Sequence, residues 1–328
     1  MYLEFFGLKK DPFSTASDHT MLFLSAVHEE AMAGVCYGLM SRKGLMVLLG
    51  DAGTGKTTIL ERAIDRLPRN RVWLRTIYNP MLTGAEFLEA ILRCFDVEDV
   101  PPSKPQRLLQ LTKRLAEARE QRIIPTLAID EAHKLSPEAL EETRLLGNIE
   151  FQAQKLLQIL LIGQNELSAL LNRPEWLQLK QRVALRLSLK PLTAAEVPHY
   201  IQHRWACAGG GQYPPFSEAA MDLIVQNSTG IPRLINVICD NSLLAAFSEQ
   251  SSTVQAGHVR QSCKDLDIGF SASAPAPAPP VKAVEPMPPR GEDTILPTLE
   301  RLARPSFLTR WFTGRHDGRP RQAAIATD

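Results

Sequence analysis

One short stretch of the chain carries residues suited to holding a polyphosphate. It fits the pattern G-x-x-x-x-G-K-[ST] at every fixed position and consists of Gly50, Asp51, Ala52, Gly53, Thr54, Gly55, Lys56 and Thr57, followed by Thr58. The glycines let the backbone turn tightly and bring its N–H groups to phosphate oxygens. A helix that begins near Lys56 points the positive end of its dipole at the same anion. We therefore expect Lys56 to reach the β- and γ-phosphates and the Thr57 hydroxyl to bind Mg²⁺.

The flanking sequence supports this site, because the pattern requires a strand before it and a helix after it. The apolar run Leu45–Leu49 has the length of a strand, and residues 58–67 place apolar side chains at helical spacing. The alternative is a glycine-rich turn ahead of an unrelated helix. That interpretation leaves a second motif downstream without an explanation.

The second motif is a pair of acids at the end of the apolar run that begins at Ile123. We expect Asp130 to hold Mg²⁺, usually through water, and Glu131 to orient and polarise an attacking water. The same tetrapeptide, Asp-Glu-Ala-His, occurs in DEAH-box helicases, but a helicase needs a second motor domain and too little chain remains for one. His133 is then a loop residue that couples the site to a neighbouring element, or it is simply exposed.

The composition is that of an ordinary globular protein. The 328 residues leave room for two domains, 44% of them are hydrophobic, and the formal net charge is +1. The overall charge therefore gives no argument for binding to nucleic acid or to an anionic membrane, although it does not exclude a local basic patch. Five cysteines without a C-x-x-C pair indicate reduced thiols. We find neither a signal peptide nor an apolar run near the ~18 residues of a membrane span, so we expect a cytoplasmic protein unless a partner recruits it to the inner membrane.

Strand and helix patterns alternate through the middle of the chain. The predicted strands are 45–49, 72–78, 123–129, 156–163 and 183–189, and the predicted helices are 28–41, 58–67, 84–95 (capped by Thr83), 106–121, 137–150 and 175–182. This alternation predicts an α/β fold, a mostly parallel sheet in an αβα sandwich, with nucleotide at the carboxyl ends of the strands. Gln164 follows the fourth strand, where a polar side chain can touch the γ-phosphate or water.

Only helices follow, at 193–207, 217–227, 232–249 and 255–266, which predicts a small α-helical second domain. Arg233 falls in the first turn of the third of these helices, where the helix dipole disfavours a cation. An anionic partner offsets that cost, so we expect Arg233 to contact the γ-phosphate.

The two ends of the chain differ from its middle. Residues 1–41 comprise an aromatic arm and a helix packed on the nucleotide-binding core, and the arm either walls the adenine pocket or only covers apolar surface. We expect a nucleotide-binding domain at 42–191, a helical lid at 192–270 and a disordered Pro- and Ala-rich tail at 271–328. Within the tail, residues 296–312 are a short docking segment for a partner or an anionic membrane surface, or part of an unselected tail.

Together these motifs resemble the AAA+ superfamily, and more narrowly the ExeA/GspA-type ATPases of general secretion. The resemblance covers residues 1–268. Besides the glycine loop and the two acids, it rests on the opening Met1-Tyr2, Phe5 to Leu8 and Asp11 to Phe13, on Leu161 to Gln164, and on Gly230 to Asn236.

The resemblance implies further roles. It implies Mg²⁺-dependent ATP binding and hydrolysis, with Gln164 as the sensor-1 residue and Arg233 as the sensor-2 residue. It also implies a homo-oligomer in which an arginine finger acts on the ATP of the next subunit, with Arg182 as the first choice and Arg186 as the second. Such a finger neutralises charge that develops during phosphoryl transfer.

The sequence also departs from that group. Asp51 replaces the usual Glu of the loop, Asn165 and His19 stand where relatives commonly have Pro, and we expect none of the three to touch the ATP chemistry. Secretion members typically continue into a transmembrane helix and a peptidoglycan-binding domain, and we expect neither in this sequence. That weakens the specific role in secretion and leaves the ATPase assignment intact.

Three functions fit the sequence. The first is an oligomeric switch or assembly motor that hydrolyses ATP and serves a protein partner in secretion or envelope export. The alternative is a DNA-binding ATPase that regulates transposition, like the related TnsC-type proteins. A nucleotide-bound scaffold with little turnover is the third, and Glu131 argues against it.

Overall fold

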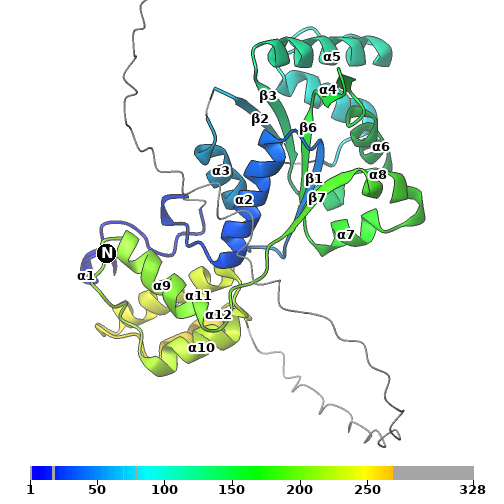
Figure 1. Ribbon diagram of the computed structural model, residues 1–328. Coiled ribbons are helices and arrows are strands. Elements are labelled where there is room, and N and C mark those ends of the chain that lie inside the picture. The colour runs from blue at the N-terminus through cyan, green and yellow to red at the C-terminus, as the bar shows by residue number, and fades with distance from the viewer. Residues whose placement is uncertain (1, 17–18, 69, 79, 269–328) are drawn as a thin grey trace, which may run out of the picture. The chain divides into compact units, whose positions relative to one another are not determined.

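The computed structural model describes residues 2–16, 19–68, 70–78 and 80–268, which belong to one compact unit (Figure 1). The expected Pro-rich tail and its docking segment lie outside the described residues. No helix within those ranges is long and apolar enough to cross a bilayer.

A five-stranded sheet is the centre of the fold, and every pairing in it is parallel. Its order is β2-β3-β6-β1-β7. The strands are β1 (Leu45–Leu49), β2 (Val72–Ile77), β3 (Ile124–Ile129), β6 (Gln158–Gly163) and β7 (Val183–Ser188). This arrangement confirms the predicted α/β class, and it places β6 between the strand before the glycine loop and the strand before the two acids.

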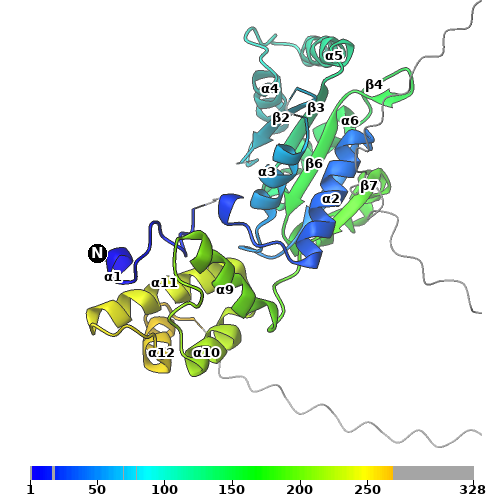
Figure 2. The same ribbon diagram turned by 60° about the vertical axis from the view of Figure 1, so that its left-hand side comes forward.

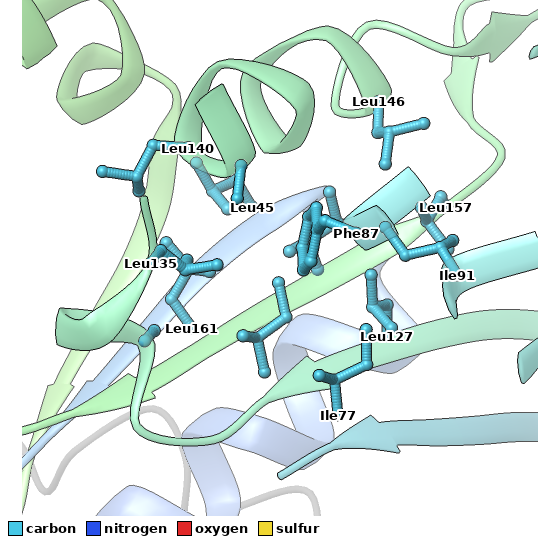
Figure 3. Close-up of a cluster of buried hydrophobic side chains, with 14 of the residues drawn as sticks. Leu45, Ile77, Phe87, Ile91, Leu127, Leu135, Leu140, Leu146, Leu157 and Leu161 are labelled. Carbon is cyan, nitrogen blue, oxygen red and sulfur yellow. The ribbon is translucent and has the colours of Figure 1, made fainter. Parts of the chain in front are cut away.

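Helices cover both faces of the sheet (Figures 1 and 2). On one face lie α2 (Ala26–Met40) and α3 (Lys56–Arg66), which share an apolar cluster with Met46 and Leu48 of β1. The other face carries α4 (Gly84–Cys94), α5 (Lys104–Glu120) and α6 (Pro137–Leu146), whose apolar side chains meet Leu45 and Leu161 (Figure 3). Side chains alternate across a strand, so a uniformly apolar run such as Leu45–Leu49 serves both clusters.

Local sequence signals set several helix starts. Thr83 caps α4 in a complete capping box with Glu86, as the sequence predicts. Ser136 caps α6 through the Ala139 N–H, with Pro137 in the first turn. Each such cap contributes about 1 kcal/mol.

The region after α6 differs from the prediction. The helix ends at Leu146, and a hairpin of β4 (Glu150–Phe151) and β5 (Gln154–Lys155) follows it. Its turn residues Gln152 and Ala153 both have positive φ, 51° and 59°. Hairpin turns of this kind normally contain Asn or Gly, so the sequence offers no signal for this one. The helix α7 (Asn165–Leu171) and the split of 174–181 into η3 (Pro174–Trp176) and α8 (Leu177–Gln181) were also not predicted.

The second half of the described chain is helical, as expected. It contains α9 (Glu196–Cys207), α10 (Glu218–Ser228), α11 (Pro232–Ser248) and α12 (Ala256–Asp265). The arm residues Leu8, Phe13 and Met21 join the core of these helices. The arm itself forms α1 (Tyr2–Phe5), and Tyr2 donates a 2.6 Å hydrogen bond to Asp240 of α11. Residues 2–16 therefore pack on the helices rather than on the sheet.

A tight turn fixes the start of α11. The Leu192 N–H donates to the Gly230 carbonyl at 2.8 Å. Gly230 has φ of 75°, and a Cβ built on it would lie 1.9 Å from the Leu192 oxygen. Only glycine allows both the left-handed backbone and the close approach.

We predict that Gly230→Ala destabilises the protein by roughly 3 kcal/mol, because it adds left-handed strain and a steric clash. Urea unfolding with an unchanged m value would measure the loss. The matched control is Gly257→Ala in α12, where an added Cβ meets nothing within 4 Å and no loss is expected. Equal midpoints for the two variants would contradict the prediction.

Candidate functional site

The glycine loop connects the end of β1 to the start of α3. The Gly50 N–H donates to the Gly163 carbonyl at 3.2 Å, which ties the loop to the end of β6. Gly55 directly precedes α3 and has φ of 90°. This left-handed residue turns the chain into the helix, so that the first N–H groups of α3 face the loop.

The loop also contacts the start of α11. The Arg233 N–H lies 3.3 Å from the Gly53 carbonyl. A Cβ at Gly53, where φ is 79°, would lie 2.6 Å from the Arg233 Cβ. Glycine is therefore required at position 53, because any side chain there would prevent α11 from contacting the loop.

Lys56 lies inside the loop, with 7% of its surface exposed. Its Nζ donates to the carbonyls of Gly50 at 2.9 Å and Asp51 at 3.0 Å. Burial lowers the pKa of the Lys56 ammonium, and the charges of Glu131 and Asp130 oppose that shift. These carboxylates favour the charged form that a polyphosphate requires.

Thr57 and Asp130 come from different elements and meet at the mouth of the loop. The Thr57 Oγ1 donates to the Asp130 Oδ2 at 2.9 Å. Mg²⁺ prefers oxygen ligands at about 2.0–2.1 Å in an octahedron, so two adjacent ligands lie about 2.9 Å apart. The chemistry and spacing of these two oxygens fit a Mg²⁺ site that both residues share, directly or through water.

Glu131 adopts an unusual backbone conformation beside this pair. Its φ is 53°, and its N–H donates to the Asp130 Oδ1 at 2.9 Å. Its carboxylate lies 3.2 Å from the Lys134 Nζ and 3.5 Å from the His133 Nε2. The His133 side chain is 13% exposed, which excludes the interpretation that it is simply exposed.

A cavity of about 290 Å³ brings these residues together. From the predicted set, its walls include residues 52–58, Asp130, Glu131 and Arg233. The remaining walls come from the arm and from the helices, and comprise Ser14, Thr15, Ala16, Met21, Leu22, Phe23, His28, Leu192, Tyr200, Arg204, Pro232 and Asn236. The arm thus lines the cavity, as it would if it formed a wall of the adenine pocket.

The arm keeps this position through a buried cation. The Arg204 guanidinium, 7% exposed, donates to the carbonyls of Pro12 at 2.5 Å and Ser14 at 3.2 Å. The Asn236 side chain also donates to the Ser14 carbonyl, at 3.4 Å. Bonds from α9 and α11 therefore set the path of the arm along the cavity.

Three of the predicted site residues that do not belong to the glycine loop also do not line the cavity. Gln164 follows β6, between the strands that lead to the loop and to Asp130, but it does not line the cavity. Arg182 precedes β7, whose first residue pairs with Leu45 at the start of β1. The glycine loop is one strand length away, roughly 16 Å at about 3.3 Å per residue. Arg186 lies within β7, and its guanidinium contacts the Ser168 hydroxyl.

Two residues near the loop were not predicted to contact it. His28 is 3% exposed, and its Nε2 lies 3.2 Å from the Thr54 carbonyl while its Nδ1 lies 2.6 Å from the Ser25 hydroxyl. A carbonyl only accepts, so Nε2 carries the proton. The Asn165 side chain donates to the Asp51 carboxylate at 2.8 Å, so two departures from the family pattern contact each other. No local sequence signal marks either contact, because the partners are far apart in the chain.

We predict that His28→Leu weakens ADP binding about five- to tenfold, since the loop loses one hydrogen bond of about 1 kcal/mol. His28→Gln, which keeps a donor, should stay closer to wild type. Titration calorimetry measures both, with His199→Gln on the exposed face of α9 as the control. Wild-type affinity in His28→Leu would show that the contact is not needed.

The pH dependence of stability gives a second test of His28. Burial lowers the pKa of its imidazole, so the folded protein binds this proton less readily than the unfolded chain does. The resulting stability is present above the unfolded pKa of about 6.5 and is lost as the pH falls through the folded pKa. Thermal unfolding between pH 7.5 and 5.5 should therefore show a smaller loss in His28→Gln than in wild type. Parallel curves would contradict this.

Comparisons with known proteins show which proteins this chain is similar to. Residues 39–171 match the family model described as AAA domain. The chain is 39% identical over 267 residues to general secretion pathway protein A of Aeromonas hydrophila, an alignment that covers 79% of this chain and 47% of the relative. The chain therefore spans about half the length of that relative.

Solved structures share the fold. The chain resembles Cdc6p from Pyrobaculum aerophilum with a TM-score of 0.60 at 21% identity, over 79% of this chain and 71% of that one. It resembles the ORC2 protein of Aeropyrum pernix in its ADPNP–ADP complexes with a TM-score of 0.57 at 16% identity, over 78% and 72% of the two chains. These structures show the shared fold. The family model and the curated relative, together with the strand order and the glycine loop, identify the chain as a member of the AAA+ superfamily, similar to general secretion pathway protein A.

Proposed function

We propose that this protein is a Mg²⁺-dependent ATPase that works as an oligomeric switch or assembly motor. The observation that carries the proposal is the convergence of Lys56, the Thr57–Asp130 pair and Glu131 on one cavity. A site for nucleotide binding alone would not need a carboxylate beside the metal ligands. Glu131 supplies the group that hydrolysis requires.

The residues divide the work between binding and chemistry. The N–H groups of the glycine loop and the Lys56 ammonium would hold the phosphates, while Thr57 and Asp130 would hold Mg²⁺, which would supply positive charge to the phosphates. Glu131 takes the proton of the attacking water. Gln164 orients that water or the γ-phosphate, and Arg233 senses the γ-phosphate from the helical part.

The position of Arg182 favours a shared site. It stands at the amino-terminal edge of the sheet, about a strand length from its own glycine loop, so it would act on the ATP of a neighbouring subunit. In this structure its guanidinium donates to the Arg144 carbonyl at 3.1 Å and to the Asn148 side chain. Arg186, the second candidate, lies on the exposed face of β7.

The division into a nucleotide-binding domain at 42–191 and a lid at 192–270 belongs to this proposal, because Arg233 would couple the two on ATP binding. The relative's name favours a role in secretion or envelope export, at the cytoplasmic side of the inner membrane with a protein partner. A DNA-binding ATPase that regulates transposition is the alternative. Strong stimulation of hydrolysis by DNA would favour the alternative over secretion.

We predict that Glu131→Gln binds ATP and hydrolyses it at least 10²-fold more slowly, in the usual range for loss of a general base. Lys56→Ala should fail to bind ATP. Single-turnover hydrolysis and nucleotide retention on a filter separate the two effects. The matched control is Glu138→Gln, an exposed carboxylate on α6. Equal turnover in wild type and Glu131→Gln would remove Glu131 from the mechanism.

We predict that Arg182→Ala loses at least 10³-fold in hydrolysis rate, the lower end of the range for arginine fingers, and keeps its ATP affinity. Mixing it with Lys56→Ala, whose finger is intact, should restore part of the activity. Arg173→Ala, at an exposed arginine with 62% of its side chain accessible, is the control. If Arg186→Ala shows the loss and the rescue instead, the second candidate is the finger. Absence of rescue with either variant would exclude a finger in trans.

A further inference from the structure

Cations gather where the strands of the sheet begin. All five strands are parallel, so their starts lie at one edge. A basic residue stands just before every one of them. These are Arg71 before β2, Arg122 before β3, Lys155 before β6, Arg42 and Lys43 before β1, and Arg182 before β7. Because the whole chain has a net charge of only +1, this is a local concentration of charge.

Four arginines form the part of this edge near β2, β3 and α5, and we call Arg42, Arg71, Arg119 and Arg122 the arginine cluster. The Arg42 guanidinium donates to the Ile123 carbonyl at 3.2 Å. The Arg71 carbonyl accepts from the Ile124 N–H at 2.7 Å, and the Arg119 carbonyl accepts from the Arg122 N–H at 2.8 Å. These bonds hold the four residues on adjacent backbone segments.

The arginine cluster lacks counter-charges from the described residues. None of its four members forms an ion pair with a carboxylate in the described part of the chain, whereas the nearby Arg114 pairs with Glu117 and Asp96. The Arg42 Nη1 is buried and finds no hydrogen-bond partner among the described residues. Burial lowers the pKa of Arg42, and the charges of Arg119 and Arg71 lower it further. Gathering like charges in this way is unfavourable unless an anion joins them.

We propose that the arginine cluster binds the phosphate backbone of double-stranded DNA. The planar guanidinium fork matches phosphate oxygens and can bind them through two parallel hydrogen bonds. Arg71 and Arg122 are exposed and come from adjacent strands about 4.8 Å apart. An open row of this kind cannot enclose a single small anion, but it can contact several phosphates of one backbone and release their counterions.

A membrane surface fits the cluster less well. Binding at a membrane interface combines cations with a broad exposed apolar face. The aromatic side chain beside the cluster is Phe151 of the hairpin, which is 50% exposed. Its ring lies 4.8 Å from the Arg119 guanidinium, and Arg119 also donates to Gln152 at 3.2 Å. The hairpin thus places an arginine over its ring instead of presenting an apolar surface.

This inference goes beyond the ATPase proposal and does not depend on it. DNA binding by the cluster would favour the alternative role in transposition over the role in secretion. The arginine cluster lies at the edge of the sheet opposite the glycine loop, and none of its members lines the nucleotide cavity. Loss of DNA binding and loss of ATP hydrolysis can therefore be measured separately in the same variants.

The test is fluorescence anisotropy of a labelled 30-base-pair duplex of arbitrary sequence with the full chain, at ~50 to 200 mM salt. The double variant Arg71→Glu/Arg122→Glu should bind at least tenfold more weakly at the lowest salt. The slope of log affinity against log salt should fall in magnitude by about 2, because each arginine neutralises one phosphate in wild type.

The control Lys113→Glu/Lys264→Glu changes net charge equally at exposed sites of α5 and α12 and should stay within twofold of wild type. ADP affinity and melting temperature verify folding, and the milder Arg71→Gln/Arg122→Gln replaces the first variant if it does not fold.

Three results would overturn the proposal. The first is failure of the wild-type protein to bind the duplex at the lowest salt. The second is equal weakening in the cluster variant and its control, which would assign the binding to net charge. The third comes from sedimentation with vesicles of phosphatidylglycerol and phosphatidylcholine. Cluster-dependent binding to these vesicles without binding to DNA would assign the surface to a membrane instead.

Discussion

The hydrogen bond between the Thr57 hydroxyl and the Asp130 carboxylate depends on a strand that contributes neither residue. Thr57 follows β1 and Asp130 follows β3, and β6 lies between these strands in the sheet. Because the three strands are parallel, their carboxyl ends meet at one edge, and the two oxygens reach a spacing that suits Mg²⁺. Glu131 comes next in the chain and needs its left-handed backbone to turn beside the pair. The nucleotide site is thus a consequence of strand order.

The same parallel arrangement separates charge between the two edges of the sheet. The carboxyl edge carries Asp51, Asp130 and Glu131 around Lys56, whose charged form these acids favour. The amino edge carries the arginine cluster and Arg182. A protein with almost no net charge therefore has two edges of opposite character, and both could be used at once in an oligomer. In our account the acidic edge binds ATP, Arg182 acts on the ATP of the neighbouring subunit, and the arginine cluster binds a polyanion.

The sequence was sufficient to predict the strands of the sheet and the position of the glycine loop between a strand and a helix. Uniformly apolar runs, helical spacing and the fixed glycines of the loop are local signals, and they located all five strands within a few residues. The contacts of His28 with Thr54 and of Asn165 with Asp51 could not be predicted, because each joins residues that only the fold brings together. The hairpin at Glu150–Phe151 was missed for a different reason. Its turn places Gln152 and Ala153 at positive φ without the usual Asn or Gly.

Long-range packing also explains what the aromatic arm does. Its spacing has no regular period, so the sequence left two interpretations open. The structure shows Arg204 and Asn236 bonding to the arm's carbonyls, so that residues 14–16 line the nucleotide cavity. The residues that make this contact lie in α9 and α11, 190 to 222 residues further along the chain.

The central claim is that the active site is shared between subunits. The measurement that tests it most directly is the steady-state rate of ATP hydrolysis per protomer, at saturating ATP and Mg²⁺, over a range of protein concentration that spans assembly. A site completed by a neighbour's Arg182 predicts that the rate per protomer rises with concentration and levels off when assembly is complete. A rate per protomer that stays constant from monomer to oligomer would contradict the account.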